Sequence, residues 1–126
     1  MSFMHDKSLE HRKRRHAHKL INYYDIRFEQ SGIRRPIVFE EGSCPQWYPI
    51  LVPDAQPLTD FLRYNNVGAS RWPWFEMPEV IMNDRALFPS TTLLHERMVL
   101  LPLHEKVKIK DAKTIVDLVD DFLDVL

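Results

Sequence analysis

Cysteine, glycine and long apolar runs are scarce in this sequence, and each scarcity excludes a class of protein. Cys44 is the single cysteine; it cannot form an internal disulfide and has no CxxC partner, so we expect a plain thiol. The three glycines, Gly32, Gly42 and Gly68, cannot assemble a GxGxxG fingerprint or a phosphate-binding loop. No apolar run approaches the roughly 20 residues that a membrane-spanning helix needs, so no membrane partner is expected.

Signals for export and for several kinds of catalysis are also missing. The N-terminal residues contain no apolar segment of the secretory kind, so we expect a cytoplasmic location. His95 and Glu96 begin an HExxH motif, but Val99 stands where its second histidine would be. No desolvated lysine is visible either, because a charged tract contains Lys106, Lys108, Lys110 and Lys113. We therefore predict no catalytic residue, no cofactor-binding residue and no metal ligand in this chain.

Charge is distributed unevenly along the chain, although the net charge is only -1. Residues 1–35 hold nine lysines or arginines against four carboxylates, and residues 1–13 are predicted to be a basic N-terminal arm or helix extension. The run HRKRRHAHK could bind nucleic acid, but it lacks interleaved aromatics, so a solvated helix face is the preferred interpretation and no nucleic acid is expected. A metal site is not expected, because no carboxylate or cysteine lies at a spacing that would complete a ligand set with His5, His11, His16 and His18.

Apolar periodicity predicts two long helices. The first spans Ser8 to Glu29, and its apolar residues recur at steps of three and four, although the pattern weakens before His16. Its first turns therefore have little to pack against, and Gly32 supplies its end. The second spans Ile109 to Leu123 and carries a wide apolar stripe. Two shorter helices are predicted, one with Pro57 in its first turn and one at Thr91–Glu96 capped by Ser90.

Strand patterns surround a buried run at Met98–Leu101, which Pro102 should terminate. Trp47–Val52 is a second strand, and its Pro49 indicates an edge position or a bulge. Ile33–Phe39 is predicted to be an edge strand or an extended connection, and Ala69–Trp74 a short extended segment, with irregular structure from 78 to 87. Residues 14–126 should therefore form one α+β domain, a two-layer sandwich with helices covering a small, largely antiparallel sheet.

One segment combines residue types that suit ligand binding. Ser70 to Phe75 places the guanidinium of Arg71 among three aromatics, including Trp72 and Trp74. This combination can bind an anion while stacking on an apolar or sugar-like body, so Arg71, Trp72 and Trp74 are candidates for a ligand-facing patch. We expect Arg71 to be held at the surface by a tryptophan rather than in an internal ion pair. The alternative is that the tryptophans pack in the core, with Arg71 at the rim.

Taken in order, these segments resemble a known family. The long helix with Arg14, Arg15, Asn22 and Tyr23 is followed by YPILV, LTDFLRYNNVG, SRWPW and FPSTTLLHERMVLLPLH, then by a final helix. This order resembles the C-terminal small domain of the DegT/DnrJ/StrS aminotransferases, which are pyridoxal-phosphate enzymes that often act on nucleotide-linked keto sugars.

The resemblance implies a role without independent activity. In such enzymes a separate large domain carries the cofactor lysine and the carboxylate that faces the pyridine nitrogen, and no position here matches either. The chain would then supply one wall of the substrate cleft, with Arg71, Trp72 and Trp74 toward substrate. Its partner would be a large domain or a chain that carries one, and homo-oligomers are possible. The alternative is a stand-alone binding or interaction module that reuses this fold without catalysis.

Overall fold

The computed structural model describes residues 3–33, 35, 45–71 and 89–125. These residues form four helices and a three-stranded antiparallel sheet, which confirms the predicted α+β class. In chain order the elements are α1 (Phe3–Gln30), β1 (Trp47–Leu51), α2 (Ala55–Tyr64), β2 (Ser70–Arg71), α4 (Pro89–Arg97), β3 (Met98–Pro102) and α5 (Ile109–Val125).

The strand β3 is the centre of the sheet, whose strand order is β1, β3, β2. All five of its residues are buried, as the unbroken apolar run predicts. Its last residue, Pro102, lies opposite Trp47 of β1, so pairing ends at the proline as expected. Pro49 lies on β1, an edge strand, where a missing backbone donor is tolerated because one side of the strand needs no ladder bond.

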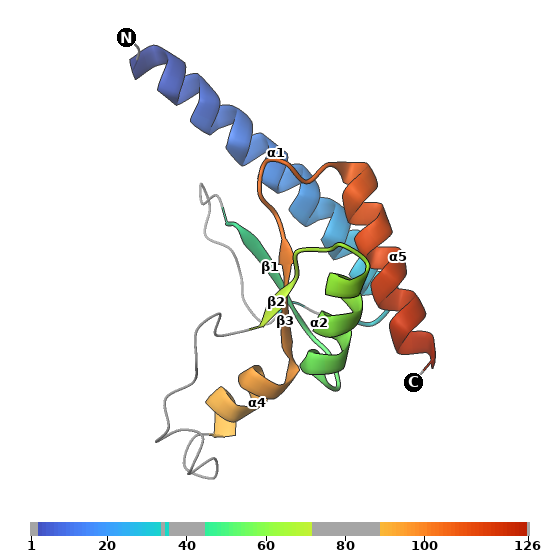
Figure 1. Ribbon diagram of the computed structural model, residues 1–126. Helices are drawn as coiled ribbons and strands as arrows, with labels where there is room; N and C mark the ends of the chain where they lie inside the picture. Colours follow the sequence, from blue (N-terminus) through green and yellow to red (C-terminus); the bar gives the residue numbers. More distant parts are fainter. Residues whose placement is uncertain (1–2, 34, 36–44, 72–88, 126) are drawn as a thin grey trace.

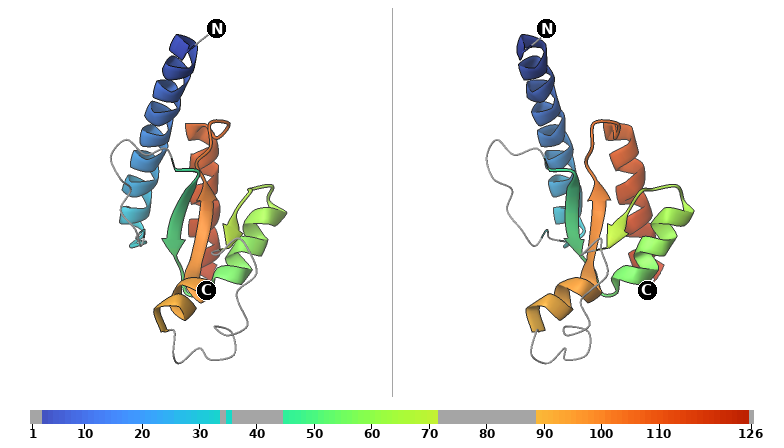
Figure 2. Two further views of the ribbon diagram at one scale, coloured as in Figure 1. Left: turned by 90° about the vertical axis from the view of Figure 1, so that its left-hand side faces the viewer. Right: turned by 60° about the vertical axis from the view of Figure 1, so that its left-hand side comes forward.

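The helices α1, α2 and α5 lie on one face of the sheet, as Figures 1 and 2 show. From the sheet, Tyr48 packs against Tyr24 and Phe28 of α1, with ring centroids 4.8 and 5.9 Å away. Val99 and Leu101 of β3 join the same core as the apolar stripe of α5. Each large side chain buried in this layer contributes about 1.5 to 3 kcal/mol of transfer free energy.

Two helix ends use residues in the left-handed conformation. Gly32 follows α1 with a φ of 75°, and the amide of Ile33 donates to the Phe28 carbonyl at 2.9 Å. Asn66 follows α2 with a φ of 65°, and the backbone amide of the next residue donates to a carbonyl of α2 in the same way. Both satisfy carbonyls that the helix leaves unpaired, and the end of α1 predicted at Gly32 is confirmed.

Two helix starts differ from the predictions. The prediction of Ser90 as the cap of α4 is wrong, because the helix begins at Pro89 and Ser90 lies inside it. The helix α1 begins at Phe3, before the predicted Ser8, and its first half projects from the body of the domain (Figure 1). Most of the predicted segment at 33–39 and the irregular stretch at 78–87 lie outside the described residues. No helix in the described ranges has the length and apolar character to cross a membrane.

Candidate functional site

Of the three residues predicted to bind substrate, Arg71 is the one that the structure describes. Its side chain joins three elements. It lies at the end of β2, opposite Val99 of β3. One terminal nitrogen donates to the side-chain oxygen of Gln56 in α2 at 2.5 Å, and the other donates to the backbone carbonyl of His95 in α4. The Nε atom is buried and has no hydrogen-bond partner. The guanidinium therefore fixes α2 and α4 relative to the sheet.

The expectation for Arg71 is met only in part. No ion pair to a carboxylate is present among the described residues, but the guanidinium is not free, because two of its nitrogens bond to neutral oxygens. Five N–H donors are available on an arginine, so these two bonds do not exhaust it. Trp72 and Trp74 lie outside the described residues. The assignment of Arg71, Trp72 and Trp74 to substrate binding stays a prediction.

His95 belongs to this site, although the sequence shows it only as the start of an incomplete HExxH motif. Its carbonyl accepts from Arg71, and its ring Nδ1 atom is buried with no hydrogen-bond partner. The two residues are 24 positions apart, on different elements. Neither a helical nor a strand period joins such positions, so no spacing in the sequence could have predicted their contact.

A second cluster of polar side chains lines a cavity where α1 meets β1. The Tyr48 hydroxyl donates to Asp25 at 2.6 Å, and the Arg35 Nε atom lies 3.1 Å from the same carboxylate oxygen. The cavity has a volume of about 600 Å³, and its described lining consists of Asp25, Glu29, Gly32, Ile33, Arg35 and Tyr48. Sequence reasoning missed this cluster because the three polar residues come from a helix, the segment after it and a strand.

The electrostatics of this cluster favour anchoring over proton transfer. Burial, and then the bond to Asp25, raise the pKa of Tyr48 well above its ordinary value. The phenol therefore stays protonated at neutral pH and acts as a donor rather than a base. Asp25 is bonded to Tyr48 and Arg35 together, so its carboxylate is a satisfied member of a structural network.

The described lysines and histidines show no arrangement that suits catalysis. Lys13 lies 3.8 Å from Glu105, and the exposed lysines are Lys19, Lys106, Lys108, Lys110 and Lys113. The bond from Lys113 to Asp117 raises the pKa of that lysine, which is opposite to what a nucleophilic amine needs. His16 bonds through Nε2 to the Val107 carbonyl at 2.5 Å. Within the described ranges, no group of three potential metal ligands was found.

Comparison with known proteins gives matches among solved structures. No protein-family model and no curated protein matches the sequence. A putative sugar aminotransferase from Streptococcus pneumoniae, in its PMP form, is 17% identical with a TM-score of 0.66, covering 85% of this chain and 30% of that one. The aminotransferase TlmJ from Streptoalloteichus hindustanus is 18% identical with a TM-score of 0.68, covering 88% of this chain and 32% of that one.

A third match carries the family's own name. A DegT DnrJ EryC1 StrS aminotransferase from Brucella abortus is 15% identical with a TM-score of 0.61, covering 90% of this chain and 31% of that one. The predicted resemblance to this family is thus confirmed at the level of the fold. This chain spans about a third of the length of the solved aminotransferases it matches.

Proposed function

We propose that this chain is the C-terminal small domain of a DegT/DnrJ/StrS-like, pyridoxal-phosphate-dependent aminotransferase, and that it is inactive alone. One observation carries the proposal: nearly all of this chain matches about a third of each solved aminotransferase. A chain of this extent would correspond to one part of such an enzyme. Its partner would be the large domain, or a separate chain that carries it.

The lysines support placing the cofactor in that partner. Covalent capture of pyridoxal phosphate requires a lysine amine that can lose its proton, and desolvation is the usual way to lower its pKa. From Lys13 to Lys113, each lysine of the chain is exposed or paired with a carboxylate, as Lys13 is with Glu105 and Lys113 with Asp117. These residues do not fit the group, so no chemical step is assigned to this chain.

The role that remains for the chain is to form one wall of the substrate cleft. Arg71 would present its remaining N–H donors to an anionic group, with Trp72 and Trp74 beside the substrate. The bonds to Gln56 and to the His95 carbonyl support this role because they hold the guanidinium in a single orientation. A fixed donor loses little conformational entropy when a ligand binds.

The proposal is tested by reduction of the purified chain with borohydride after incubation with pyridoxal phosphate and dialysis. We expect no stoichiometric lysine adduct by mass spectrometry, because no lysine whose side chain the structure describes is buried. Free pyridoxal phosphate reacts weakly with any exposed lysine, so lysozyme treated in parallel sets the background. A stoichiometric adduct mapped to one lysine of this chain would place the cofactor chemistry here and contradict the proposal.

One observation favours the alternative of a stand-alone interaction module. A large domain should dock on a gathered apolar patch of more than a few hundred Å². In the described part of the chain, the exposed large apolar side chains are divided among four helices, as Leu9, Ile26, Tyr64, Leu93 and Ile109. Size-exclusion chromatography of this chain mixed with a large-domain chain separates the two functions, because only the small domain of an aminotransferase should co-elute.

A further inference from the structure

The stretch of α1 from His11 to Lys19 carries a strongly basic surface that the proposed function does not use. We define the basic face as the exposed residues His11, Arg12, Arg14, Arg15, His18 and Lys19. Among the described residues, Arg12, Arg14, Arg15 and Lys19 make no ion pair and no side-chain hydrogen bond. Four permanent charges are therefore fully solvated on less than three turns of helix.

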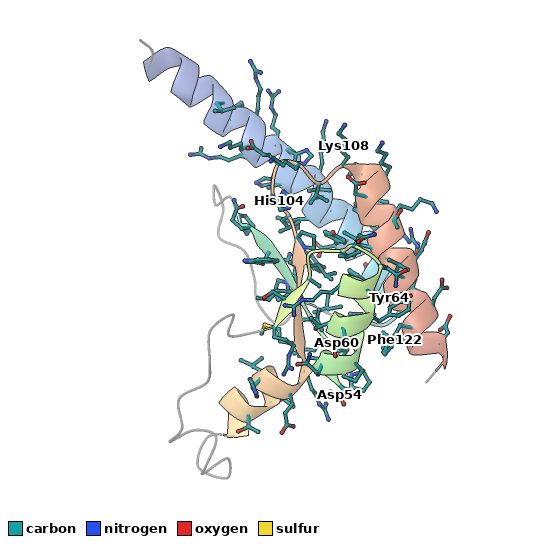
Figure 3. The ribbon with its side chains drawn as sticks, viewed as in Figure 1. Asp54, Asp60, Tyr64, His104, Lys108 and Phe122 are labelled. Atoms are coloured by element: carbon teal, nitrogen blue, oxygen red, sulfur yellow. The ribbon has the colours of Figure 1, made fainter. Side chains whose placement is uncertain are left out.

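Helical geometry places these charges on one side. Arg12, Arg15 and Lys19 are three and four residues apart and form one row, and Arg14 and His18 form a neighbouring row four apart. The opposite side contains Lys13 and His16, which contact the connection between β3 and α5 through Glu105 and Val107. Figure 3 shows the labelled His104 and Lys108 at the two ends of this connection.

The position of the charges is unfavourable for the isolated helix. Like charges three and four residues apart repel by a few tenths of a kcal/mol per pair. The other side of this stretch packs on the domain through Ala17 and Leu20, so the helix holds these like charges close together. A bound polyanion would relieve the repulsion.

We propose that the basic face binds duplex nucleic acid through its phosphates, without reading base sequence. Sequence patterning alone does not separate a solvated face from a binding face. The exposed, unpaired cations gathered on one side of α1 favour binding. Duplex DNA presents one charge per about 1.7 Å of its axis, and its major groove admits a helix. Insertion into a membrane would need an apolar face, but the apolar side of α1, with Ala17 and Leu20, is buried in the domain.

The number of cations sets the expected salt dependence. Each neutralised phosphate contributes about -0.9 to the slope of log K against log salt, so four cations predict a slope of about -3.6. Affinity should then fall roughly a hundredfold between about 50 and about 200 mM salt. Because the net charge of the chain is -1, its overall charge does not attract nucleic acid. Any binding must therefore come from the basic face.

The test is fluorescence anisotropy of a labelled DNA duplex of about 20 base pairs, titrated with the full chain at several salt concentrations. The variant Arg12→Gln/Arg15→Gln/Lys19→Gln should lower affinity at least tenfold and reduce the slope to about -1, since one cation remains. The matched control is Lys106→Gln/Lys108→Gln/Lys110→Gln, which changes the net charge equally at exposed positions and should bind within about twofold of the parent. Circular dichroism checks that both variants keep their helices.

Three outcomes would overturn the proposal. Absence of binding at about 50 mM salt would show that the basic face is only solvated. Equal weakening by both triple variants would show that net charge, and not this face, is responsible. Poly-L-glutamate competing as well as duplex DNA at equal charge concentration would assign the face to an acidic protein instead.

Discussion

Arg71 connects elements that are distant in the sequence, because its guanidinium bonds to α2 and α4 from the end of β2. A residue in this position can affect both folding and ligand binding. The Gln56 and His95 oxygens orient it, and each terminal nitrogen keeps a second N–H that could donate to a ligand. Its two roles therefore have to be separated by measuring stability and substrate affinity on the same variant.

Replacing Arg71 with Ala should lower the free energy of unfolding by about 1 to 3 kcal/mol, because hydrogen bonds from a charged donor are lost at a half-buried site. Urea unfolding measures this loss. The control is Arg97→Ala, an exposed arginine at the end of α4, which should unfold like the parent. If Arg71→Ala is as stable as the parent and weakens an anionic substrate in the assembled enzyme, the arginine serves the ligand alone.

Tyr24 and Tyr48 should make the domain sensitive to alkali. Burial raises the pKa of both phenols above their ordinary value of 10.0, so the folded state keeps protons that the unfolded chain releases. The stability this provides is complete below pH 10 and is lost as pH rises above it, by about 1.4 kcal/mol per pH unit for each tyrosine.

Urea unfolding of the parent, Tyr24→Phe and Tyr64→Phe at several pH values from about 9 to about 11 tests this linkage. The free energy of unfolding of Tyr24→Phe should decline less steeply with pH than that of the parent. The difference in slope is the contribution of the one proton that Tyr24 retains in the folded state. Tyr64 is 87% exposed, so Tyr64→Phe should follow the parent curve. Identical slopes for all three proteins would show that Tyr24 titrates in the folded state as it does in the unfolded chain.

At the scale of elements, β3 organises the domain, since it pairs with both other strands and is buried along its whole length. Replacing Leu100, which is 4% exposed, with Asp should unfold the domain. A buried unpaired carboxylate costs several kcal/mol against a total stability of about 5 to 15 kcal/mol. Circular dichroism at 25 °C measures the remaining helix, with the exposed-site variant Ile26→Asp as the control. A folded Leu100→Asp domain would contradict the central position of β3.

Elements with strong periodicity were predictable from the sequence, and contacts between them were not. The stripe of α5 and the apolar run of β3 depend on local patterns that burial enforces. The start of α4 was not predictable, because Ser90 has a strong capping preference but Pro89 is equally compatible with a first helical turn. The contact between Arg71 and His95, and the bond from Tyr48 to Asp25, depend on tertiary packing that no single-chain period encodes.

At the scale of the whole molecule, the domain has two surfaces with different proposed roles. The end of β2 with Arg71 is assigned to a substrate cleft completed by a partner. The basic face of α1 is exposed along residues 11–19 and is assigned to nucleic acid. These assignments are independent, because a variant of the basic face leaves Arg71 and its bonded oxygens unchanged.

The most direct test of the account is co-expression of this chain with a large-domain chain that supplies the rest of the aminotransferase fold, followed by assay of amino-group transfer to keto sugars from a panel of amino acids. The account predicts that the two chains co-purify, that borohydride fixes the cofactor to a lysine of the large-domain chain, and that only the pair transfers the amino group. Full activity of the large-domain chain alone, unchanged when this chain is added, would contradict the assignment of this chain as the missing small domain.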